Sequence, residues 1–235
     1  MKSKMINNLI GVGATLLGLA IAKKGGVKFL NSDDDFMVTG FNTQIDTTMF
    51  DFIKDFETFA PKAYNLGDGK ITIGYGCTEW LDSKGNRIRS VKMGDVISEP
   101  DALELMRRFC IAFQKPLDEI MRNRQYEFTN RTYQMLLQVA YGTGAGFFYS
   151  NTGSSLLGAL HASTDNYVNA DLIRDNIIIY YKSINKRVTV GKCKGKLFYE
   201  CYGLGWSRRA YALSQYIKGI RTTRAQSEKI IIKAY

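Results

Sequence analysis

Apolar residues recur at helical spacing along most of this chain, and the first clear case lies between residues 48 and 60. Four of them occupy one helix face at positions i, i+3, i+4 and i+7: Met49, Phe52, Ile53 and Phe56. Thr48 and Asp51 have the spacing of a capping box, which predicts the start of this helix. Pro61 predicts its end, because the residue before a proline avoids helical backbone angles. Glu57 is therefore expected in the last turn, beside the apolar stripe.

The same helical period returns in the rest of the chain. Ser98 and Asp101 form a second capping box before an apolar-periodic run, and Thr129 is the expected cap of the next helix. Two further helices are predicted over residues 165–181 and 207–217.

Strand character is convincing only between Tyr64 and Arg89, where a turn is expected at residues 83–86. The chain has only three prolines, which fits a helical protein better than a β-sandwich. We therefore predict the α+β class: a mostly helical protein with a small β-hairpin lobe, a larger helical lobe and a cleft between them.

The N-terminal 24 residues form a separate segment, in which lysines flank an apolar run from Leu9 to Ala22. As a helix this run would span about 21 Å, short of the roughly 30 Å of a bilayer core. Three interpretations stay open: a weak signal or anchor, a membrane-active segment of a virion protein, and an amphipathic core helix. Residues 25–45 are predicted to be a polar linker, and residues 46–235 form the main domain.

Charge is unevenly distributed along the chain. The net charge is +10, and residues 182–235 alone carry 13 Lys and Arg against two acidic residues, a net charge of +11. Such a basic region favours an anionic partner, and both bacterial envelopes and nucleic acids are anionic. No nucleic-acid-binding motif is visible, so nucleic acid is the less favoured partner.

The four cysteines form no CxxC pair and His161 is the only histidine, so we expect neither a metal site nor another cofactor. Cys193 and Cys201 flank a predicted turn. They would form a disulfide in an exported protein and stay free thiols in one that acts from the cytosol or a virion. Cys110 falls on an apolar helix face and is expected in the core.

The segment that follows Glu57 carries the most chemistry, because it places one carboxylate and one hydroxyl at a helix-to-sheet junction. Its pattern is E-x6-Y-x4-G-x2-T-I-G-Y-G: Glu57, Tyr64, Gly69, Thr72, Ile73, Gly74, Tyr75 and Gly76. This motif resembles the active-site signature of the bacteriophage-type lysozymes, glycoside hydrolase family 24. Weaker matches follow in family order and extend the resemblance over about residues 48–217: residues 93–103, 134–144, 154–157 and 203–209.

The resemblance implies a lysozyme-like fold and cleavage of the β-1,4 bond between N-acetylmuramic acid and N-acetylglucosamine in bacterial peptidoglycan. Glu57 would be the general acid, and Thr72 would hold the attacking water, alone or with Asp68, giving inversion. Arg208 is the expected partner of Glu57. Three further residues are expected to bind substrate or support the site: Tyr64, Gly74 and Tyr75.

One position departs from the family pattern. The family has Asp or Cys nine residues after the catalytic Glu, and here that position is Leu66. Either Asp68, in an adaptable glycine-flanked turn, replaces the missing acid, or Glu57 and Thr72 work alone in a slower enzyme. The alternative function is a lysozyme-fold protein that binds peptidoglycan without cutting it, or a structural protein of the virion.

The resemblance also sets expectations for where the protein acts. It would be made in the host cytoplasm and act in the periplasm or envelope after export, or as part of a virion. We expect a monomer unless the protein is assembled into virions, with transient membrane contact through the apolar run from Leu9 to Ala22.

Overall fold

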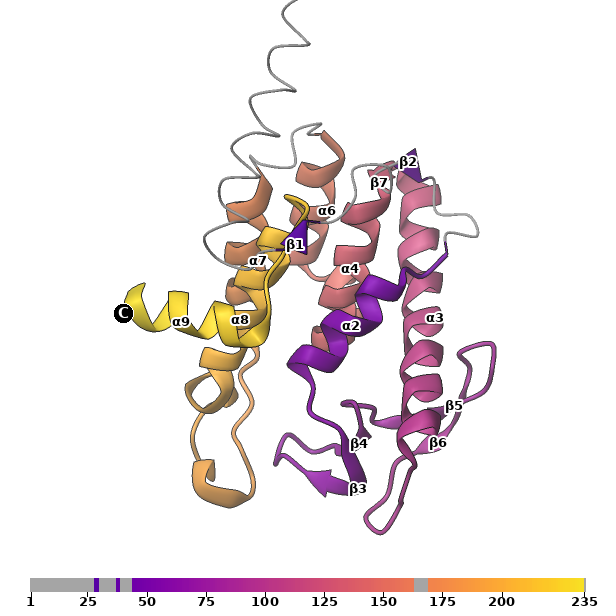
Figure 1. The fold of residues 1–235 in the computed structure, drawn as a ribbon, viewed down its shortest axis with the longest axis vertical. Helices are drawn as coiled ribbons and strands as arrows, with labels where there is room; N and C mark the ends of the chain where they lie inside the picture. Colours follow the sequence, from indigo (N-terminus) through magenta and orange to yellow (C-terminus); the bar gives the residue numbers. More distant parts are fainter. Residues whose placement is uncertain (1–27, 30–36, 39–43, 163–168, 235) are drawn as a thin grey trace, which may run out of the picture.

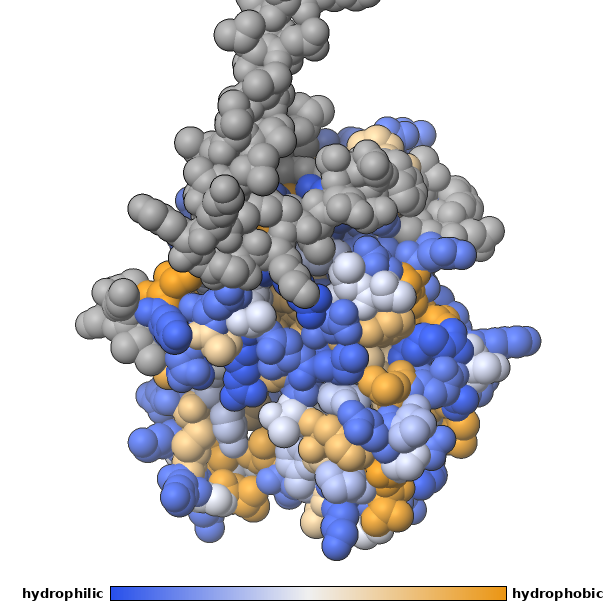
Figure 2. All heavy atoms as spheres, viewed as in Figure 1, coloured by the Kyte–Doolittle hydropathy of each residue, from blue (hydrophilic) through white to orange (hydrophobic). Residues whose placement is uncertain are grey.

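The computed structural model describes residues 28–29, 37–38, 44–162 and 169–234. The predicted N-terminal signal or anchor segment lies outside these ranges. Within them, no helix is both long and apolar enough to cross a membrane. Figure 1 shows a helical lobe above a smaller lobe of hairpins, with helix α3 running along one side of both. Hydrophilic side chains dominate the face seen in Figure 2, with hydrophobic ones interspersed among them.

The small lobe consists of two antiparallel hairpins that follow helix α2 (Thr47–Phe56). Its strands are β3 (Ala60–Asn65), β4 (Ile71–Gly74), β5 (Glu79–Leu81) and β6 (Arg87–Ser90). The β3–β4 register places Tyr64 opposite Thr72. The strand region predicted between Tyr64 and Arg89 is thus confirmed, and it begins four residues earlier, at Ala60.

The helical lobe contains the remaining described helices. They are α3 (Glu99–Arg124), α4 (Asn130–Thr143), α5 (Gly146–Tyr149), α6 (Asn151–Ala162), α7 (Asn169–Ser183), α8 (Phe198–Tyr216), α9 (Arg224–Ala234) and a 3-10 turn, η2 (Gly191–Cys193). The described secondary structure is mostly helical with small antiparallel sheets, as the sequence predicts for the α+β class.

Two short strands in the N-terminal region pair with the helical lobe. β1 (Lys28–Phe29) pairs with β8 (Ile220–Arg221), and β2 (Met37–Val38) pairs with β7 (Phe128–Thr129). The segment predicted as a polar linker therefore contains two strands that are hydrogen-bonded to the main domain.

Two predicted helix starts agree with the structure and two are corrected, while the start predicted at residue 165 lies outside the described residues. Ser98 and Thr129 cap α3 and α4 by accepting from backbone N–H groups three residues on. The cap of α2 is Asp46 rather than Thr48, because the Asp46 carboxylate accepts from the Thr48 N–H at 2.8 Å. Helix α8 begins at Phe198 instead of residue 207, since Glu200 caps it by accepting from the Leu197 N–H at 2.8 Å.

Helix α4 is the centre of the core: Asn130 and every residue from Thr132 to Ala140 are buried. Its polar side chains hold the segment that leads to Glu57. Gln138 Nε2 donates to the Met49 carbonyl at 3.0 Å, and Gln134 Nε2 donates to the Gln44 carbonyl at 2.8 Å. These two bonds fix the position of α2 on α4 and so determine where Glu57 emerges.

The connection between α7 and α8, residues 184–197, extends from the helical lobe, and we call it the arm (Figure 1). It folds back on itself: the Val188 N–H donates to the Lys196 carbonyl at 2.9 Å, and the Gly195 N–H donates to the Val188 carbonyl at 2.8 Å. A disulfide joins Cys193 in the arm to Cys201 in the first turn of α8. The other two cysteines, Cys77 and Cys110, are buried and free.

Candidate active site

Glu57 lies where helix α2 gives way to the small lobe. It is the C-cap residue of α2, with extended backbone angles, and its N–H donates to the Ile53 carbonyl at 2.7 Å. Its side chain is 29% exposed and forms an ion pair with Arg209, whose own side chain is only 5% exposed. The acid is thus held by a buried guanidinium at the end of the helix that the sequence predicts.

The expected partner of Glu57, Arg208, makes a different contact. Its Nη2 atom donates to Glu228 Oε1 at 2.6 Å, so the partner assignment is corrected to Arg209. Neighbouring residues of a helix point about 100° apart, so only one of two adjacent arginines can face Glu57. Both arginines nevertheless line the same cavity.

Arg209 is packed tightly against Trp206 and Gly142. Its guanidinium carbon lies 5.8 Å from the centre of the Trp206 ring. A Cβ atom at Gly142 would lie 2.5 Å from Trp206 Cη2 and 3.2 Å from Arg209 Cζ, so no larger residue fits there without displacing them. The Nε and Nη2 atoms of Arg209 are buried and have no hydrogen-bond partner among the described residues. Unpaired buried donors are uncommon in folded proteins and are often found at functional sites.

A cavity of about 740 Å³ lies against the Glu57–Arg209 pair, with walls from both lobes. From the small-lobe side it is lined by Glu57, Tyr64, Leu66, Asp68, Thr72 and Gly76. From the helical side its lining includes Tyr141, Gly142, Tyr181, Tyr202, Trp206, Arg208 and Arg209. The structure therefore brings the three predicted catalytic residues, Glu57, Asp68 and Thr72, to one cavity.

Three residues of the motif shape the cavity wall near the acid. Thr72 is buried, at 4% exposure, and lies opposite Tyr64 in the hairpin. Gly76 has a φ of +91°, and a Cβ atom there would lie 3.4 Å from Glu57 Oε2. A glycine at this position lets the backbone approach the Glu57 carboxylate. Gly76 is part of the sequence motif, but its closeness to Glu57 could be seen only in the structure.

Leu66 and Asp68 lie in the turn between β3 and β4. Leu66 lines the cavity at the position where the family resemblance implies an acid. Asp68 also lines it, and its Oδ1 atom accepts from the Lys70 N–H at 3.0 Å. The turn thus presents one apolar and one acidic side chain to the same space.

Two residues expected to bind substrate or support the site lie away from the cavity. Gly74 has a φ of +62°, and a Cβ atom there would lie 3.0 Å from the Ala102 Cβ of helix α3. The Tyr75 hydroxyl donates to Glu99 Oε1 at 2.6 Å. Both residues join the small lobe to α3 and can support the site only through the fold.

Burial shifts the pKa of three groups in or beside the cavity wall: Tyr64, Cys77 and Tyr141. Burial raises the pKa of the Cys77 thiol to about 12, and the charge of Glu57 adds to the shift. Burial also raises the pKa of Tyr64 and Tyr141, with Glu57 again contributing. These groups stay protonated at neutral pH, which leaves the carboxyl groups of Glu57, Asp68 and Glu79 as the acidic side chains that line the cavity. Among the described residues, no group of three His, Cys, Asp or Glu side chains is placed to hold a metal ion.

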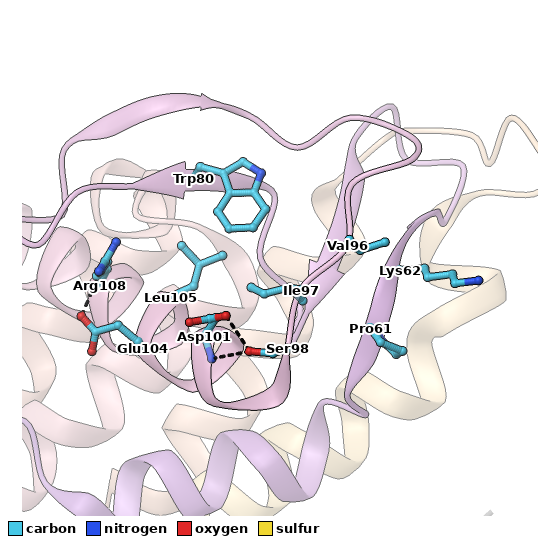
Figure 3. Close-up of a pocket in the computed structure, with 10 residues that line it drawn as sticks. All are labelled: Pro61, Lys62, Trp80, Val96, Ile97, Ser98, Asp101, Glu104, Leu105 and Arg108. Atoms are coloured by element: carbon cyan, nitrogen blue, oxygen red, sulfur yellow. Dashed lines mark hydrogen bonds and ion pairs between the residues drawn. The ribbon is translucent and has the colours of Figure 1, made fainter.

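A second cavity, of about 520 Å³, lies between the small lobe and the first turns of α3 (Figure 3). Trp80 and Leu105 form part of its apolar wall, and Asp101 and Glu104 lie along its α3 side. It shares no lining residue with the Glu57 cavity and contains none of the predicted site residues.

A family model described as phage lysozyme matches residues 54–191, more than half of the 235 residues. The match includes Glu57, Asp68 and Thr72 and ends before Arg209. A comparison with curated proteins found no significant match.

Solved structures with a similar chain trace include two proteins of low identity. One is the muramidase domain of SpmX from Asticaccaulis excentricus, at 16% identity and a TM-score of 0.49, covering 75% of this chain and 98% of that one. The other is the endolysin of Escherichia coli O157:H7 phage FAHEc1, at 20% identity and a TM-score of 0.48, covering 75% and 94%. Likenesses at this level establish no function for the chain.

Proposed function

Because the chain belongs to the phage lysozyme family, we propose that it hydrolyses peptidoglycan at the β-1,4 bond between N-acetylmuramic acid and N-acetylglucosamine. The single observation that carries this proposal is the Glu57–Arg209 ion pair in the wall of a cavity that also contains Asp68 and Thr72. Most glycoside hydrolases cleave the glycosidic bond with a pair of acidic residues that flank it in a cleft.

In the proposed reaction Glu57 gives its proton to the glycosidic oxygen as the bond to the leaving sugar breaks. A water molecule held by Thr72 and Asp68 attacks the anomeric carbon from the opposite face, and Asp68 takes up the proton that this water loses. The product then has the inverted configuration. Arg209 orients the Glu57 carboxyl group, and its buried position keeps this orientation fixed.

A reducing-end assay on purified peptidoglycan tests the proposal. We expect the full-length chain to release reducing ends and Glu57→Gln to lose at least about 100-fold in rate, the range in which general acids contribute. Glu119→Gln is the matched control, because Glu119 is exposed on α3 and lies outside the cavity lining. Equal activity of the Glu57→Gln variant and the wild type would contradict the proposal.

Leu66 supports a second candidate function, binding of peptidoglycan without cleavage. An apolar side chain at the expected acid position removes one group that could hold the attacking water. The same preparations discriminate the two functions when sedimentation with insoluble peptidoglycan is measured beside turnover. Retained binding with no turnover in the wild type would favour this second function.

We further propose that the protein acts at the bacterial envelope, which it reaches by export or as part of a virion. The family membership and the strongly basic region from residue 182 onward support an anionic wall as the partner. Fractionation of host cells and analysis of purified particles would separate the two routes.

A further inference from the structure

The arm contacts the β3–β4 turn directly and bridges the two sides of the cavity. The Thr189 N–H donates to the Gly67 carbonyl at 2.9 Å, and the Thr189 hydroxyl donates to the same oxygen at 3.0 Å. From the first turn of α8, the Tyr202 hydroxyl donates to the Leu66 carbonyl at 2.8 Å. Two consecutive backbone carbonyls of the turn are therefore held by the helical lobe.

Gly67 makes this contact sterically possible. Its φ is +85°, and a Cβ atom there would lie 2.8 Å from Val188 Cγ1 and 3.0 Å from the Val190 backbone nitrogen. A side chain at this position would push the arm away from the turn. The arm and the turn thus fit together as a close backbone contact.

The arm is itself held in place from two directions. Its internal backbone bonds close it into a hairpin-like loop, and the Cys193–Cys201 disulfide ties it to the turn of helix that carries Tyr202. The family match ends at residue 191, so it includes neither Tyr202 nor this disulfide. Gly67 and Thr189 lie inside the matched residues, so only the Tyr202 and disulfide contacts lie beyond the family match.

Asp68 directly follows the two clamped carbonyls and is flanked by Gly67 and Gly69, both with positive φ. A turn with two glycines has many backbone conformations available, so its order depends on contacts from outside. The Asp68 charge adds to the effect of burial on the pKa of Tyr64 and of Tyr181, on opposite sides of the cavity. The Asp68 carboxylate therefore lies where the hydrogen bonds from Thr189 and Tyr202 to the turn can determine its orientation.

We propose that Thr189 and Tyr202 are positioning residues for Asp68, which they hold through the Leu66–Gly67 backbone so that its carboxylate binds the attacking water. The inference rests on the proposed glycosidase function. It explains how a chain with Leu66 at the usual acid position can still present an acid to the cavity. Neither positioning residue needs to touch the substrate.

A double-mutant cycle tests this inference by kcat and KM on soluble peptidoglycan fragments. Tyr202→Phe removes only the hydroxyl that holds Leu66, and Thr189→Val removes one of the two bonds to Gly67. Each is expected to lower kcat about 10-fold with little change in KM, because small displacements of catalytic groups reduce rate strongly. In an Asp68→Asn background the same changes should have no further effect, since their target is already lost. Thr189→Ser, which keeps both donors, should retain wild-type kcat.

The outcomes separate this inference from the proposed function. If Glu57→Gln abolishes turnover but Asp68→Asn does not lower it, or the losses simply add in the double variants, the positioning roles are wrong and the glycosidase assignment stands. If the wild type has no turnover, the proposed function fails and the inference fails with it. Thermal melting of each variant shows whether it is folded. If Thr189→Val unfolds, Tyr202→Phe still tests the inference, because Tyr202 lies on α8 outside the arm.

Discussion

The Glu57–Arg209 ion pair joins residues 152 positions apart in the sequence, and both residues line the cavity. Burying an arginine is unfavourable unless its charge is paired, so removal of either partner leaves the other poorly satisfied. Arg208 has its own acidic partner and lines the same cavity, which makes it a natural comparison.

Arg209→Ala is expected to lower turnover at least about 10-fold, because Glu57 loses the group that orients it, and to destabilise the fold by about 1–3 kcal/mol. Arg208→Ala should have the smaller effect on turnover, since its ion pair is with Glu228. Reducing-end assays and urea unfolding of both variants check this. A larger loss of turnover in Arg208→Ala would contradict the partner assignment.

Gly142 is the tightest glycine contact next to the ion pair. Gly142→Ala would place a methyl group 2.5 Å from Trp206 Cη2, and overpacking of this kind destabilises proteins by about 1–3 kcal/mol. Gly205→Ala on α8 is the control, since a Cβ atom there meets no atom within 4 Å and alanine favours a helix. Thermal melting should show a lower Tm for the first variant only; equal Tm values would show that Trp206 can move without penalty.

At the level of elements, the sequence predicted most helices but not all of their caps. Asp46, Thr47 and Thr48 are three consecutive residues that can each cap a helix, and local rules do not choose among them. The structure selects Asp46, while the Thr48 hydroxyl lies 3.2 Å from the Tyr216 hydroxyl. A tertiary contact therefore decided what the capping pattern left open.

Asp46→Ala is expected to destabilise the protein by about 1 kcal/mol, because the Thr48 N–H at the start of α2 loses its acceptor. Thr47→Ala is the control, since Thr47 is exposed and its hydroxyl makes a single long hydrogen bond among the described residues, donating to Asp46 Oδ1 at 3.5 Å. Urea titrations of the two variants measure the difference. A larger loss for Thr47→Ala would show that the cap lies elsewhere.

Of the arm, the sequence predicted only a turn between Cys193 and Cys201, and it did not predict helices α5, α6 and α9. Replacing both Cys193 and Cys201 by serine removes a short covalent loop, which is expected to destabilise the protein by about 2 kcal/mol. Turnover should fall together with Tm, because the arm holds the turn that carries Asp68. Unchanged turnover and Tm would show that the arm keeps its place without the disulfide.

At the scale of the whole molecule, the parts that could be predicted are those with local signals. Helical periodicity, the strand region between Tyr64 and Arg89 and the motif from Glu57 to Gly76 are all encoded by neighbouring residues. The parts that could not be predicted depend on contacts across the chain: the choice of Arg209 over Arg208, the closeness of Gly142 to Trp206, and the bridge between Gly67 and Thr189. The spacing of residues along a sequence does not determine how distant helices are rotated relative to each other.

The most direct test of the proposed function identifies the bond that is cut. Peptidoglycan treated with the wild-type chain, or with its Glu57→Gln variant, is reduced with borohydride, and the new ends are identified by mass spectrometry. The proposed activity should give reduced N-acetylmuramic acid ends with the wild type and almost none with the variant. Reduced N-acetylglucosamine ends, or muramic acid ends released equally by both proteins, would contradict it.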